Sequence, residues 1–517
     1  MVHRSPHPDI AIPDLSLFDM VFDGAEARGH APAMADGLTG RIITYAELLD
    51  QIRRAAAGLA ARGIGKGDIV SFWAPNLPEW PVAFFAAIRV GATVHTSNPV
   101  STPEEVAYQL SDAGSRVLIT VNALSEKARE AIAECGRTID IVTLDDSPFP
   151  TLASLMIDAP LPVVDINPAS DVAALPYSSG TTGLLKGVML THRNIVAQLA
   201  QLNAAETVHM PAILGVLPFF HIYGMVVIMM LGLMRGATIV TLQKFEFEPF
   251  LRVLQDWPIT MAHIVPPMAV ALAKHPLVDR YRFPRLQWLF SGAAPLGPEL
   301  TSAVEARLKI KVRQGYGMTE ASPGTHYGVA GRERIGTVGP LMPNTECRIV
   351  DPVSGTDLPI GERGEVWVRG PQVMKGYLNN PEATAKTVDA DGWLRTGDIG
   401  IVDAHGDLTV VDRLKELIKV KGFQVAPAEL ESLLLKHPRI ADVAVIPVPD
   451  EESGEVPKAV VVAKEPLTAN EVVEFLLPHV AHYKRIRHVE FVDAIPKSPS
   501  GKILRRLLVE KERIARA

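Results

Sequence analysis

The chain has 517 residues, of which 47% are hydrophobic, and it carries a formal net charge of -7. This length is enough for a large core and at least two domains, and the mild acidity argues against a nucleic-acid-binding surface. With only two cysteines, Cys135 and Cys347, the sequence predicts no disulfide framework and fits a reducing compartment such as the cytoplasm.

Neither the ends of the chain nor its most apolar segment indicates a membrane or a sorting signal. Residues 1–10 contain charge and proline but no apolar signal core, and residues 514–517 do not form a peroxisomal address. The longest apolar run, residues 225–234, is too short to span a bilayer. It predicts a buried helix or strand.

Helical and strand patterns alternate through the first 300 residues. Apolar spacing predicts helices over residues 14–22, 44–62, 80–90 and 104–113, the second of them capped by Thr44 ahead of Glu47. Short apolar runs predict strands over residues 69–73, 92–94, 117–120, 139–144, 172–175, 238–242, 261–265 and 288–290. Strands and helices in turn predict an α/β fold of parallel sheets with covering helices.

The pattern of predicted elements changes near residue 338. Short strand patterns among Gly and Pro, at residues 347–350, 364–368 and 407–411, predict a β-rich subdomain over residues 338–411. A smaller α+β unit follows, with helical patterns at 428–435 and 469–480 and strand patterns at 443–448 and 459–463. The sequence therefore predicts an N-terminal domain over residues 1–412 and a small C-terminal domain over residues 413–517.

Residues 177–187 read Tyr-Ser-Ser-Gly-Thr-Thr-Gly-Leu-Leu-Lys-Gly and follow the strand predicted at 172–175. Hydroxyl donors, glycines that let backbone N–H groups approach a ligand, and a lysine are the chemistry for holding a polyphosphate. The segment is not a Walker loop, because no Gly-Lys here is followed by Ser or Thr. The alternative is an ordinary surface loop.

This segment resembles the phosphate-binding signature of adenylate-forming enzymes, which activate a carboxylate with ATP. Residues 176–192 are most similar to 4-coumarate–CoA ligases, although Leu185 stands where that family usually has Pro. The resemblance covers roughly residues 36–507 and keeps the family's motif order. It implies ATP contacts from Ser178, Ser179, Gly180, Thr181, Thr182, Gly183 and Lys186.

Two further segments carry nucleotide chemistry. Small residues at 291–297 follow a strand and leave room for a flat ligand, although a tight turn is the alternative. In residues 314–320 an aromatic that can stack on a base lies between glycines, and Glu320 is a hard oxygen ligand suited to Mg²⁺. The resemblance implies nucleotide contacts from Ala293, Ala294, Gln314, Gly315, Tyr316 and Thr319, and Mg²⁺ on Glu320.

An aspartate in a predicted turn, Asp398, and a basic segment, residues 412–425, lie near the predicted domain boundary. Asp398 could accept both ribose hydroxyls, and residues 412–425 would ordinarily be a solvated charged face. The resemblance implies that Asp398 and Arg413 bind ribose and that Lys415 is the pivot of a mobile lid and a nucleotide contact. It also places Lys419 and Gln424 near the acyl-adenylate and Lys421 and Gly422 along the CoA path.

The acyl side and the C-terminal loop complete the predicted site. Residues 496–505 resemble the family's C-terminal loop, whose lysine, here Lys502, reaches the reacting carboxylate and the α-phosphate. His221 by itself would be a buried core histidine, and the resemblance makes it a gate beside the carboxylate. Lys244 aligns, less specifically, with a lysine that meets CoA phosphate. The implied pocket residues are Tyr223, Gly292, Gly317, Pro323 and Gly324, with a backbone turn as the alternative role for Gly324.

The resemblance implies an ATP-dependent carboxylate–CoA ligase that uses ATP, Mg²⁺ and coenzyme A, as a monomer or homodimer. The apolar, uncharged pocket fits a 4-coumarate or cinnamate-like acid, or alternatively a medium- or long-chain fatty acid. A luciferase-type monooxygenase shares the motifs, and an acyl-AMP ligase would lack an open CoA path. An amino-acid-activating domain would need an acid near Phe219 and Phe220, and a catalytically dead regulator would be expected to lack Lys502 or Glu320; this chain retains both.

Overall fold

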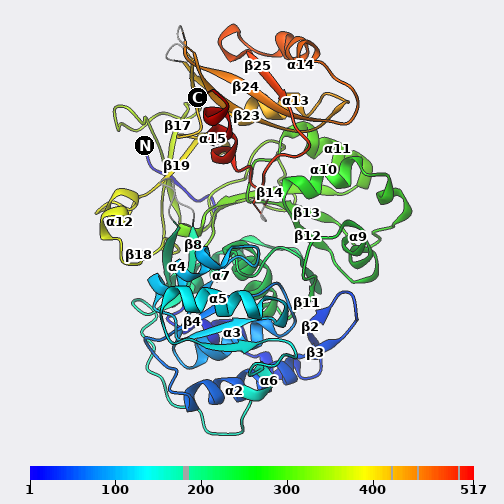
Figure 1. The fold of residues 1–517 in the computed structure, drawn as a ribbon. Helices are drawn as coiled ribbons and strands as arrows, with labels where there is room; N and C mark the ends of the chain where they lie inside the picture. Colours follow the sequence, from blue (N-terminus) through cyan, green and yellow to red (C-terminus); the bar gives the residue numbers. More distant parts are fainter. Residues whose placement is uncertain (179–184, 421–422, 451–452, 499–500, 517) are drawn as a thin grey trace.

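The computed structural model describes residues 1–178, 185–420, 423–450, 453–498 and 501–516, without the side chains of Phe423, Gln424 and Arg516. A small C-terminal unit sits above a larger body in the view of Figure 1. No helix within these ranges has the length and apolar character needed to cross a membrane.

The large body contains a seven-stranded sheet in the order β18-β9-β8-β5-β4-β6-β7. Its strands are β4 (Ile69–Trp73), β5 (Thr93–Thr96), β6 (Val117–Thr120), β7 (Asp140–Thr143), β8 (Val172–Ser178), β9 (Lys186–Thr191) and β18 (Gly376–Tyr377). From β8 to β7 all neighbours are parallel, which confirms the predicted sheet type, whereas β9 and β18 pair antiparallel. The helices of this part are α1 (Leu17–Phe22), α2 (Tyr45–Ala61), α3 (Trp80–Arg89), α4 (Pro103–Ala113), α5 (Ser125–Cys135), α6 (Leu152–Leu155) and α7 (His192–Ala205).

Two four-stranded sheets complete the α/β part. One has the order β10-β11-β2-β3, with β2 (Pro32–Asp36), β3 (Ile42–Thr44), β10 (Ala212–Gly215) and β11 (Thr238–Thr241). The other has the order β12-β13-β14-β15, with β12 (Met261–Ile264), β13 (Trp288–Ser291), β14 (Lys311–Gly317) and β15 (Gly324–Tyr327). The neighbouring helices are α8 (Leu231–Met234), α9 (Phe247–Asp256), α10 (Pro266–Lys274) and α11 (Pro298–Leu308).

The predicted β-rich region forms a five-stranded antiparallel sheet in the order β1-β16-β17-β19-β20. Its strands are β1 (His3–Arg4), β16 (Glu346–Val350), β17 (Gly364–Arg369), β19 (Leu394–Val402) and β20 (Leu408–Arg413), and α12 (Pro381–Thr387) lies between β18 and β19. The sequence pattern missed the contribution of β1, because two residues at the start of the chain carry no periodicity.

The C-terminal unit has its own sheet and its own apolar cluster. Its elements are β21 (Ile418–Val420), β22 (Phe423–Val425), α13 (Pro427–Leu434), β23 (Ile440–Asp450), β24 (Gly454–Ala463), α14 (Ala469–Leu476), β25 (His488–Phe491) and α15 (Arg505–Arg516). We call residues 413–517 the lid. The proposed boundary falls between the last strand of the β-rich sheet, which ends at Arg413, and the first lid strand, which begins at Ile418.

Two element ends differ from the sequence prediction for local reasons, and one apolar run that could have been a helix or a strand is resolved. Helix α1 begins at Leu17 and not at residue 14, because the Ser16 side chain accepts a hydrogen bond from Asp19 N and caps it. Helix α14 ends at Leu476, before Pro478, which has no N–H to continue the ladder. The run at 225–234 lies in a largely buried helix that begins at Tyr223; Tyr223–Met230 is a π-helix, a form often found at functional sites, and Leu231–Met234 is α8.

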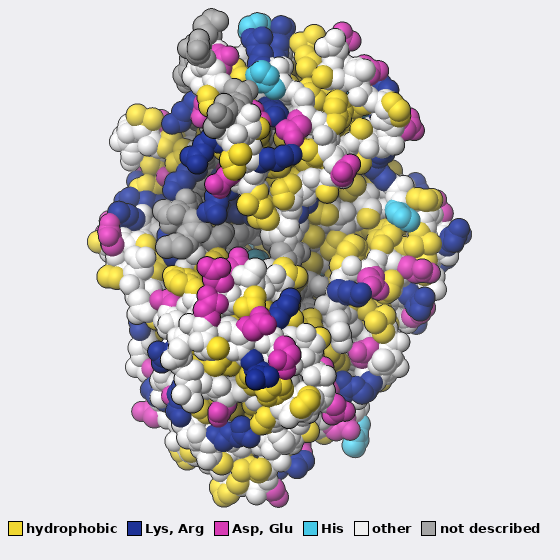
Figure 2. Space-filling model, viewed as in Figure 1, with side chains coloured by type: hydrophobic (Ala, Val, Ile, Leu, Met, Phe, Trp, Pro, Cys, Tyr) yellow, Lys and Arg dark blue, Asp and Glu magenta, His cyan; other side chains and the backbone are white. Residues whose placement is uncertain are grey.

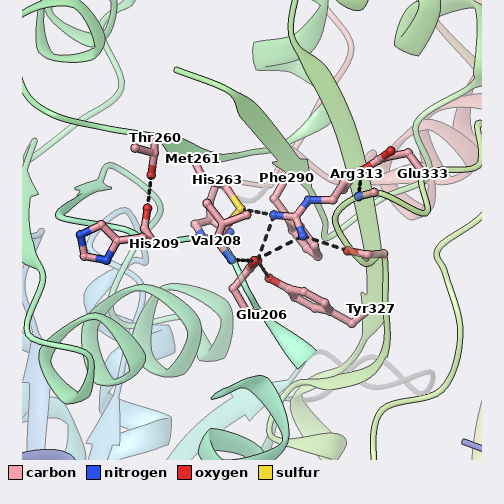
Figure 3. Close-up of polar contacts among 12 residues, drawn as sticks. Glu206, Val208, His209, Thr260, Met261, His263, Phe290, Arg313, Tyr327 and Glu333 are labelled. Atoms are coloured by element: carbon pink, nitrogen blue, oxygen red, sulfur yellow. Dashed lines mark hydrogen bonds and ion pairs between the residues drawn. The ribbon is translucent and has the colours of Figure 1, made fainter. Parts of the chain in front are cut away.

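A buried ion pair joins the end of α7 to strand β14. The Arg313 Nη2 and Glu206 Oε2 atoms are 2.9 Å apart, and both side chains are fully buried. Figure 3 shows Glu206 at the centre of the contacts: it also accepts hydrogen bonds from Tyr327 Oη (2.5 Å) and Val208 N (2.7 Å). A charge this deep is tolerable only while its partner remains.

We expect Glu206→Ala to lower the free energy of unfolding of the large body by about 3–5 kcal/mol, because it leaves the Arg313 guanidinium buried and unpaired. Removing both charges, as in Glu206→Leu with Arg313→Met, should recover most of the loss. Equilibrium unfolding in denaturant measures both. The control is Glu126→Ala, which breaks an exposed pair with Arg129 and should cost less than about 1 kcal/mol. Equal effects of Glu206→Ala and Glu126→Ala would contradict this expectation.

Candidate active site

The predicted phosphate segment connects two adjacent strands of the seven-stranded sheet. Ser178 ends β8, Lys186 begins β9, and the two residues are register partners. The remaining predicted contacts of this segment, Ser179, Gly180, Thr181, Thr182 and Gly183, lie outside the described residues. The strand pair therefore brings a hydroxyl and an ammonium to the two ends of the segment.

Glu320 lies against both ends of this segment. Its Oε1 atom accepts hydrogen bonds from Ser178 Oγ (2.8 Å) and Tyr377 Oη (2.9 Å), and its side chain is almost completely buried. The Lys186 ammonium lies 5.1 Å from the centre of the Tyr377 ring. A hydroxyl, a carboxylate and an ammonium thus converge from β8, β9 and the 3₁₀ turn Thr319–Ala321.

This carboxylate fits a magnesium ion that is held mainly by a polyphosphate. Among the described residues no group of three or more His, Cys, Asp or Glu side chains could hold a metal. Mg²⁺ commonly binds through one or two carboxylates together with substrate phosphates and water, so a single Glu320 beside the phosphate segment is the expected donor set.

A second cluster lies at the β-rich sheet. Tyr316 Oη donates a 2.6 Å hydrogen bond to Asp398 Oδ2, and Arg413 Nε is 3.3 Å from Asp398 Oδ1. Burial raises the pKa of the Asp398 carboxyl, and the Arg413 guanidinium opposes that rise. Strands β14, β19 and β20 each supply one member, which brings together the predicted base-stacking and ribose-binding residues.

The Gln314 side chain is occupied by the backbone. Its Oε1 accepts from Leu296 N and its Nε2 donates to Leu296 O, both at 3.1 Å. Gln314 therefore fixes the loop after β13, in which Ala293 adopts a left-handed φ of 69° and precedes Ala294. The structure gives Gln314 a supporting role for the predicted nucleotide loop.

Lys502 reaches this site from the lid. The pKa of its ammonium is lowered to about 8, chiefly by burial and also by the Arg413 charge, while Asp398, Glu416 and Glu320 act in the opposite direction. All four charges are therefore close enough to Lys502 to act on it. Figure 2 shows dark blue Lys and Arg side chains beside the hollow between the lid and the large body.

The lid loop that carries Lys502 packs on the large body. Gly501 has a φ of 78°, and a Cβ there would lie 2.8 Å from Pro267 Cδ, so glycine suits both the conformation and the close approach. Two further contacts cross between the parts: Lys436 Nζ to Glu299 Oε1 at 2.5 Å and Lys274 Nζ to Leu435 O at 3.4 Å. These contacts hold the loop that carries Lys502 against the large body.

His221 and Tyr223 lie on the acyl side. The pKa of His221 is lowered to about 4, chiefly by burial and also by the Lys502 ammonium, so the imidazole is neutral near pH 7. The Tyr223 ring lies against Gly292, where a Cβ would come within 2.9 Å of it. The predicted gate and pocket wall therefore adjoin Lys502 and the loop after β13.

Two predicted pocket glycines, Gly317 and Gly324, and the predicted nucleotide contact Gly315 are confined by their neighbours. A Cβ at Gly317 would lie 2.0 Å from Pro323 O, and one at Gly315 would lie 2.8 Å from the Phe290 ring. Gly324 lacks the left-handed φ of the turn alternative, and its Cβ would contact Met342 Sδ at 3.1 Å and the Gln198 side chain at 3.4 Å. Gly324 is therefore tightly packed, and its pocket role stays a prediction.

Other predicted residues are not brought into these clusters. Lys244 is exposed and pairs with Glu246 at 2.5 Å, and the exposed Lys419 lies on β21, where its backbone N–H donates to Glu455 Oε2. Lys415 is exposed in the turn between the proposed domains. Lys421, Gly422 and the side chain of Gln424 lie outside the described residues. The described contacts therefore do not test the predicted CoA path, and it stays a prediction.

Sequence reasoning missed Tyr377, which contacts both Glu320 and Lys186. The only hint in the sequence was the glycine that precedes it, since Gly376 adopts a φ of 148°, which side chains other than glycine rarely adopt. A two-residue strand of this kind has no periodicity from which its partner could be inferred.

Comparison with known proteins places this geometry in context. The family model described as AMP-binding enzyme matches residues 21–378, and the model for its C-terminal domain matches residues 429–502. A 4-coumarate–CoA ligase 2 of Nicotiana tabacum is 44% identical over 529 residues, which cover 99% of this chain and 97% of that protein.

Two solved structures of one protein, MatB from Rhodopseudomonas palustris, are similar to this chain at 30% identity. The ATP-bound form gives a TM-score of 0.88 and the apo form 0.77, each over 96% of this chain and 99% of MatB. The arrangement described here is therefore more similar to the ATP-bound form than to the apo form.

We expect the Lys502 ammonium to titrate near pH 8, because burial outweighs its neighbouring carboxylates. Asp398→Asn should lower that midpoint further, since the Asp398 charge favours the protonated amine. NMR of lysines labelled at Cε, with Lys502→Arg to assign the signal, measures both midpoints. A midpoint above pH 10 would show that Lys502 is solvated and does not lie in the site.

Proposed function

Because this chain belongs to the AMP-binding enzyme family, we propose that it is an ATP-dependent carboxylate–CoA ligase that acts on a 4-coumarate-like acid. The acid and ATP first give acyl-AMP and pyrophosphate, and CoA then gives acyl-CoA and AMP. The single observation that supports the two-step scheme best is the convergence of Lys502, Glu320 and Asp398 from separate parts of the chain.

In the first step a carboxylate oxygen attacks the α-phosphorus and pyrophosphate leaves. Lys186 and the hydroxyl-rich segment would hold the β- and γ-phosphates, and Mg²⁺, when bound at Glu320, would supply charge neutralisation to the leaving group. Asp398 accepts the ribose hydroxyls, with Tyr316 and Arg413 holding its carboxylate in place.

Lys502 supplies positive charge where negative charge develops at phosphorus. In a buried site such a preorganised donor acts more strongly than in water. The neutral imidazole of His221 beside it adds no competing charge and would shield the reacting carboxylate from water.

The second step requires Lys502 to withdraw so that the CoA thiol can reach the acyl carbon. The described contacts between lid and large body include partly exposed polar pairs such as Lys436–Glu299. Exposed pairs of this kind stabilise by less than about 1 kcal/mol. A lid held in this way can turn at Lys415 and present Lys421 and Gly422 to CoA.

Two finer assignments belong to the same proposal. Cys135 and Cys347 are both free, which supports a reducing location such as the cytoplasm. The oligomeric state, monomer or homodimer, stays a prediction.

The experiment that tests the function scores AMP formation across a panel of acids, with and without CoA. We expect 4-coumarate and cinnamate to give CoA-dependent AMP and the matching thioester, with fatty acids of medium or long chain as the second candidate class. Pyrophosphate release that is complete without CoA, and yields no thioester when CoA is added, would indicate an acyl-AMP ligase.

We expect Lys502→Ala to slow adenylation by about 10²–10³-fold and to leave CoA transfer from supplied acyl-AMP nearly unchanged, because its charge is needed only at phosphorus. In the unaltered enzyme adenylation should also decline above about pH 8, as Lys502 loses its proton. Lys502→Arg, which stays charged, should remove that decline. Equal losses in the two half-reactions of Lys502→Ala would refute the assignment.

We expect Lys415→Pro to spare adenylation and to slow CoA transfer, since proline restricts the φ change that a hinge requires. Single-turnover kinetics of each half-reaction measures this. The matched control is Lys415→Ala, which removes the side chain and keeps the backbone free. If Lys415→Ala slows transfer as much as Lys415→Pro does, the side chain and not the hinge is responsible.

A further inference from the structure

The segment that leads to His221 is held by side chains from the edge of the seven-stranded sheet. Strand β10 ends at Gly215, and the described residues 216–221 lie in neither a helix nor a strand. Backbone N–H and C=O groups in such a segment have no regular ladder, so the buried ones need side-chain partners. Two buried side chains supply them, and we call this pair, Asn76 and Thr96, the brace.

Asn76 uses both ends of its amide on this segment. Its Nδ2 atom donates to Gly215 O and to Leu217 O, both at 2.9 Å, and its Oδ1 atom accepts from Phe219 N at 2.8 Å. A side-chain amide offers two N–H donors and an acceptor oxygen, so the three bonds engage both donors and the oxygen. They fix the backbone of residues 215–219 relative to Asn76.

Thr96 and Trp80 add contacts on the same segment. Thr96, the last residue of β5, donates from Oγ1 to Phe220 O at 2.8 Å. The Trp80 and Phe219 rings meet edge to face with their centroids 5.8 Å apart, and both side chains are fully buried. The hydrogen bonds of the brace therefore reach the residue that precedes His221.

The brace lies at the edge of the sheet that carries the phosphate segment. Strands β4, β5 and β8 are parallel neighbours, so their carboxyl ends lie at one edge. Asn76 follows β4, Thr96 ends β5 and Ser178 ends β8. In sheets of this type ligands bind outside the carboxyl ends of the strands. The brace therefore connects the edge at which the site lies to the segment of His221.

His221 is fixed in turn by its own neighbours. Its backbone N–H donates to Pro218 O at 3.1 Å, and its Nδ1 atom accepts from Tyr223 N at 3.3 Å. Because the imidazole is neutral near pH 7 and Nδ1 is an acceptor, the ring proton is on Nε2. A Cβ at Gly224 would lie 2.1 Å from Pro218 O, so the segment packs tightly against the start of the helix. A displacement of residues 215–220 would therefore move His221 as well.

We propose that Asn76 and Thr96 are positioning residues for adenylation, which act by holding His221 in place at the reacting carboxylate. The inference rests on the proposed function, because it assumes that His221 lies beside that carboxylate. The brace acts only through the backbone of residues 215–220. Displacing a group near the chemistry by about 1 Å can cost about 10²-fold in rate.

The test is a double-mutant cycle with His221, measured as pyrophosphate release from ATP and 4-coumarate in a single turnover. Asn76→Asp keeps the size and the acceptor oxygen but loses both N–H donors, and Thr96→Val keeps the shape but loses the hydroxyl. We expect Asn76→Asp to slow adenylation about 100-fold and Thr96→Val about 10-fold. In a His221→Ala enzyme, which should itself be slow, each change should cost less than about 2-fold, because the residue that the brace positions is absent.

Thr143 provides a control for the loss of a buried hydroxyl. It ends β7, is buried like Thr96, and donates from Oγ1 to Asp145 O at 2.8 Å. Strand β7 is an edge strand that β4 and β6 separate from β5. Thr143→Val should therefore leave the rate of adenylation nearly unchanged even if it lowers the melting temperature. Melting curves of all variants show which of them fold, and Thr96→Val alone completes the test if Asn76→Asp does not fold.

The outcomes separate this inference from the function on which it rests. If the losses are as large in the His221→Ala enzyme as in the unaltered one, or if Thr143→Val slows adenylation as much as Thr96→Val does, the brace has no such role and the ligase function stands. If His221→Ala leaves adenylation unchanged, the assumed place of His221 is wrong and the inference fails, while the ligase function again stands. Failure of the unaltered enzyme to form acyl-AMP from any acid of the panel would overturn both.

Discussion

The partly buried position of the Lys502 ammonium, at the junction of two parts of the chain, is the constraint on which the rest of the structure depends. A charge is costly in a buried site unless opposite charges surround it. Asp398 and Glu320 on the large body and Glu416 on the lid supply them, while Arg413 acts against them. The site is therefore complete only when the lid lies on the large body.

The lid carries a network that ties the loop of Lys502 to the proposed hinge at Lys415. Arg505, three residues after Lys502, bonds to Glu416 and, at 2.6 Å, to Glu431. Asp412, before the hinge, accepts hydrogen bonds from Arg413 N and Ala428 N. Because these bonds link the first and last segments of the lid, movement at Lys415 would carry Lys502 with it as a unit.

Much of the fold was predictable because it follows from local chemistry. The structure has the predicted capping box of Thr44 and Glu47 at the start of α2, and strands β4 and β6 have the bounds predicted from their apolar runs. Contacts between distant segments were not predictable in this way. Tyr377 reaches Glu320 from a two-residue strand, and Glu206 meets Arg313 across 107 residues.

The candidate site also combines features that the sequence predicted with contacts between distant segments that it did not. The family resemblance implied that Ser178, Glu320 and Lys502 serve one site. In the structure Ser178 Oγ donates a 2.8 Å hydrogen bond to Glu320, and the Glu320 charge acts on the pKa of Lys502. Sequence could not show that the Gln314 amide is engaged by the Leu296 backbone, or that the Tyr223 hydroxyl lies 3.0 Å from His263 Nδ1. Both depend on neighbours far away in the chain, for which a single sequence has no periodic signal.

The central claim is that catalysis passes through a bond between the acid's carboxylate oxygen and the α-phosphorus. The most direct measurement uses 4-coumarate labelled with ¹⁸O in its carboxylate and determines the isotope content of the AMP by mass spectrometry. The account predicts one ¹⁸O atom in each AMP formed, because the carboxylate oxygen stays on phosphorus when CoA takes the acyl group. Unlabelled AMP formed together with thioester, or ADP with label in inorganic phosphate, would contradict it.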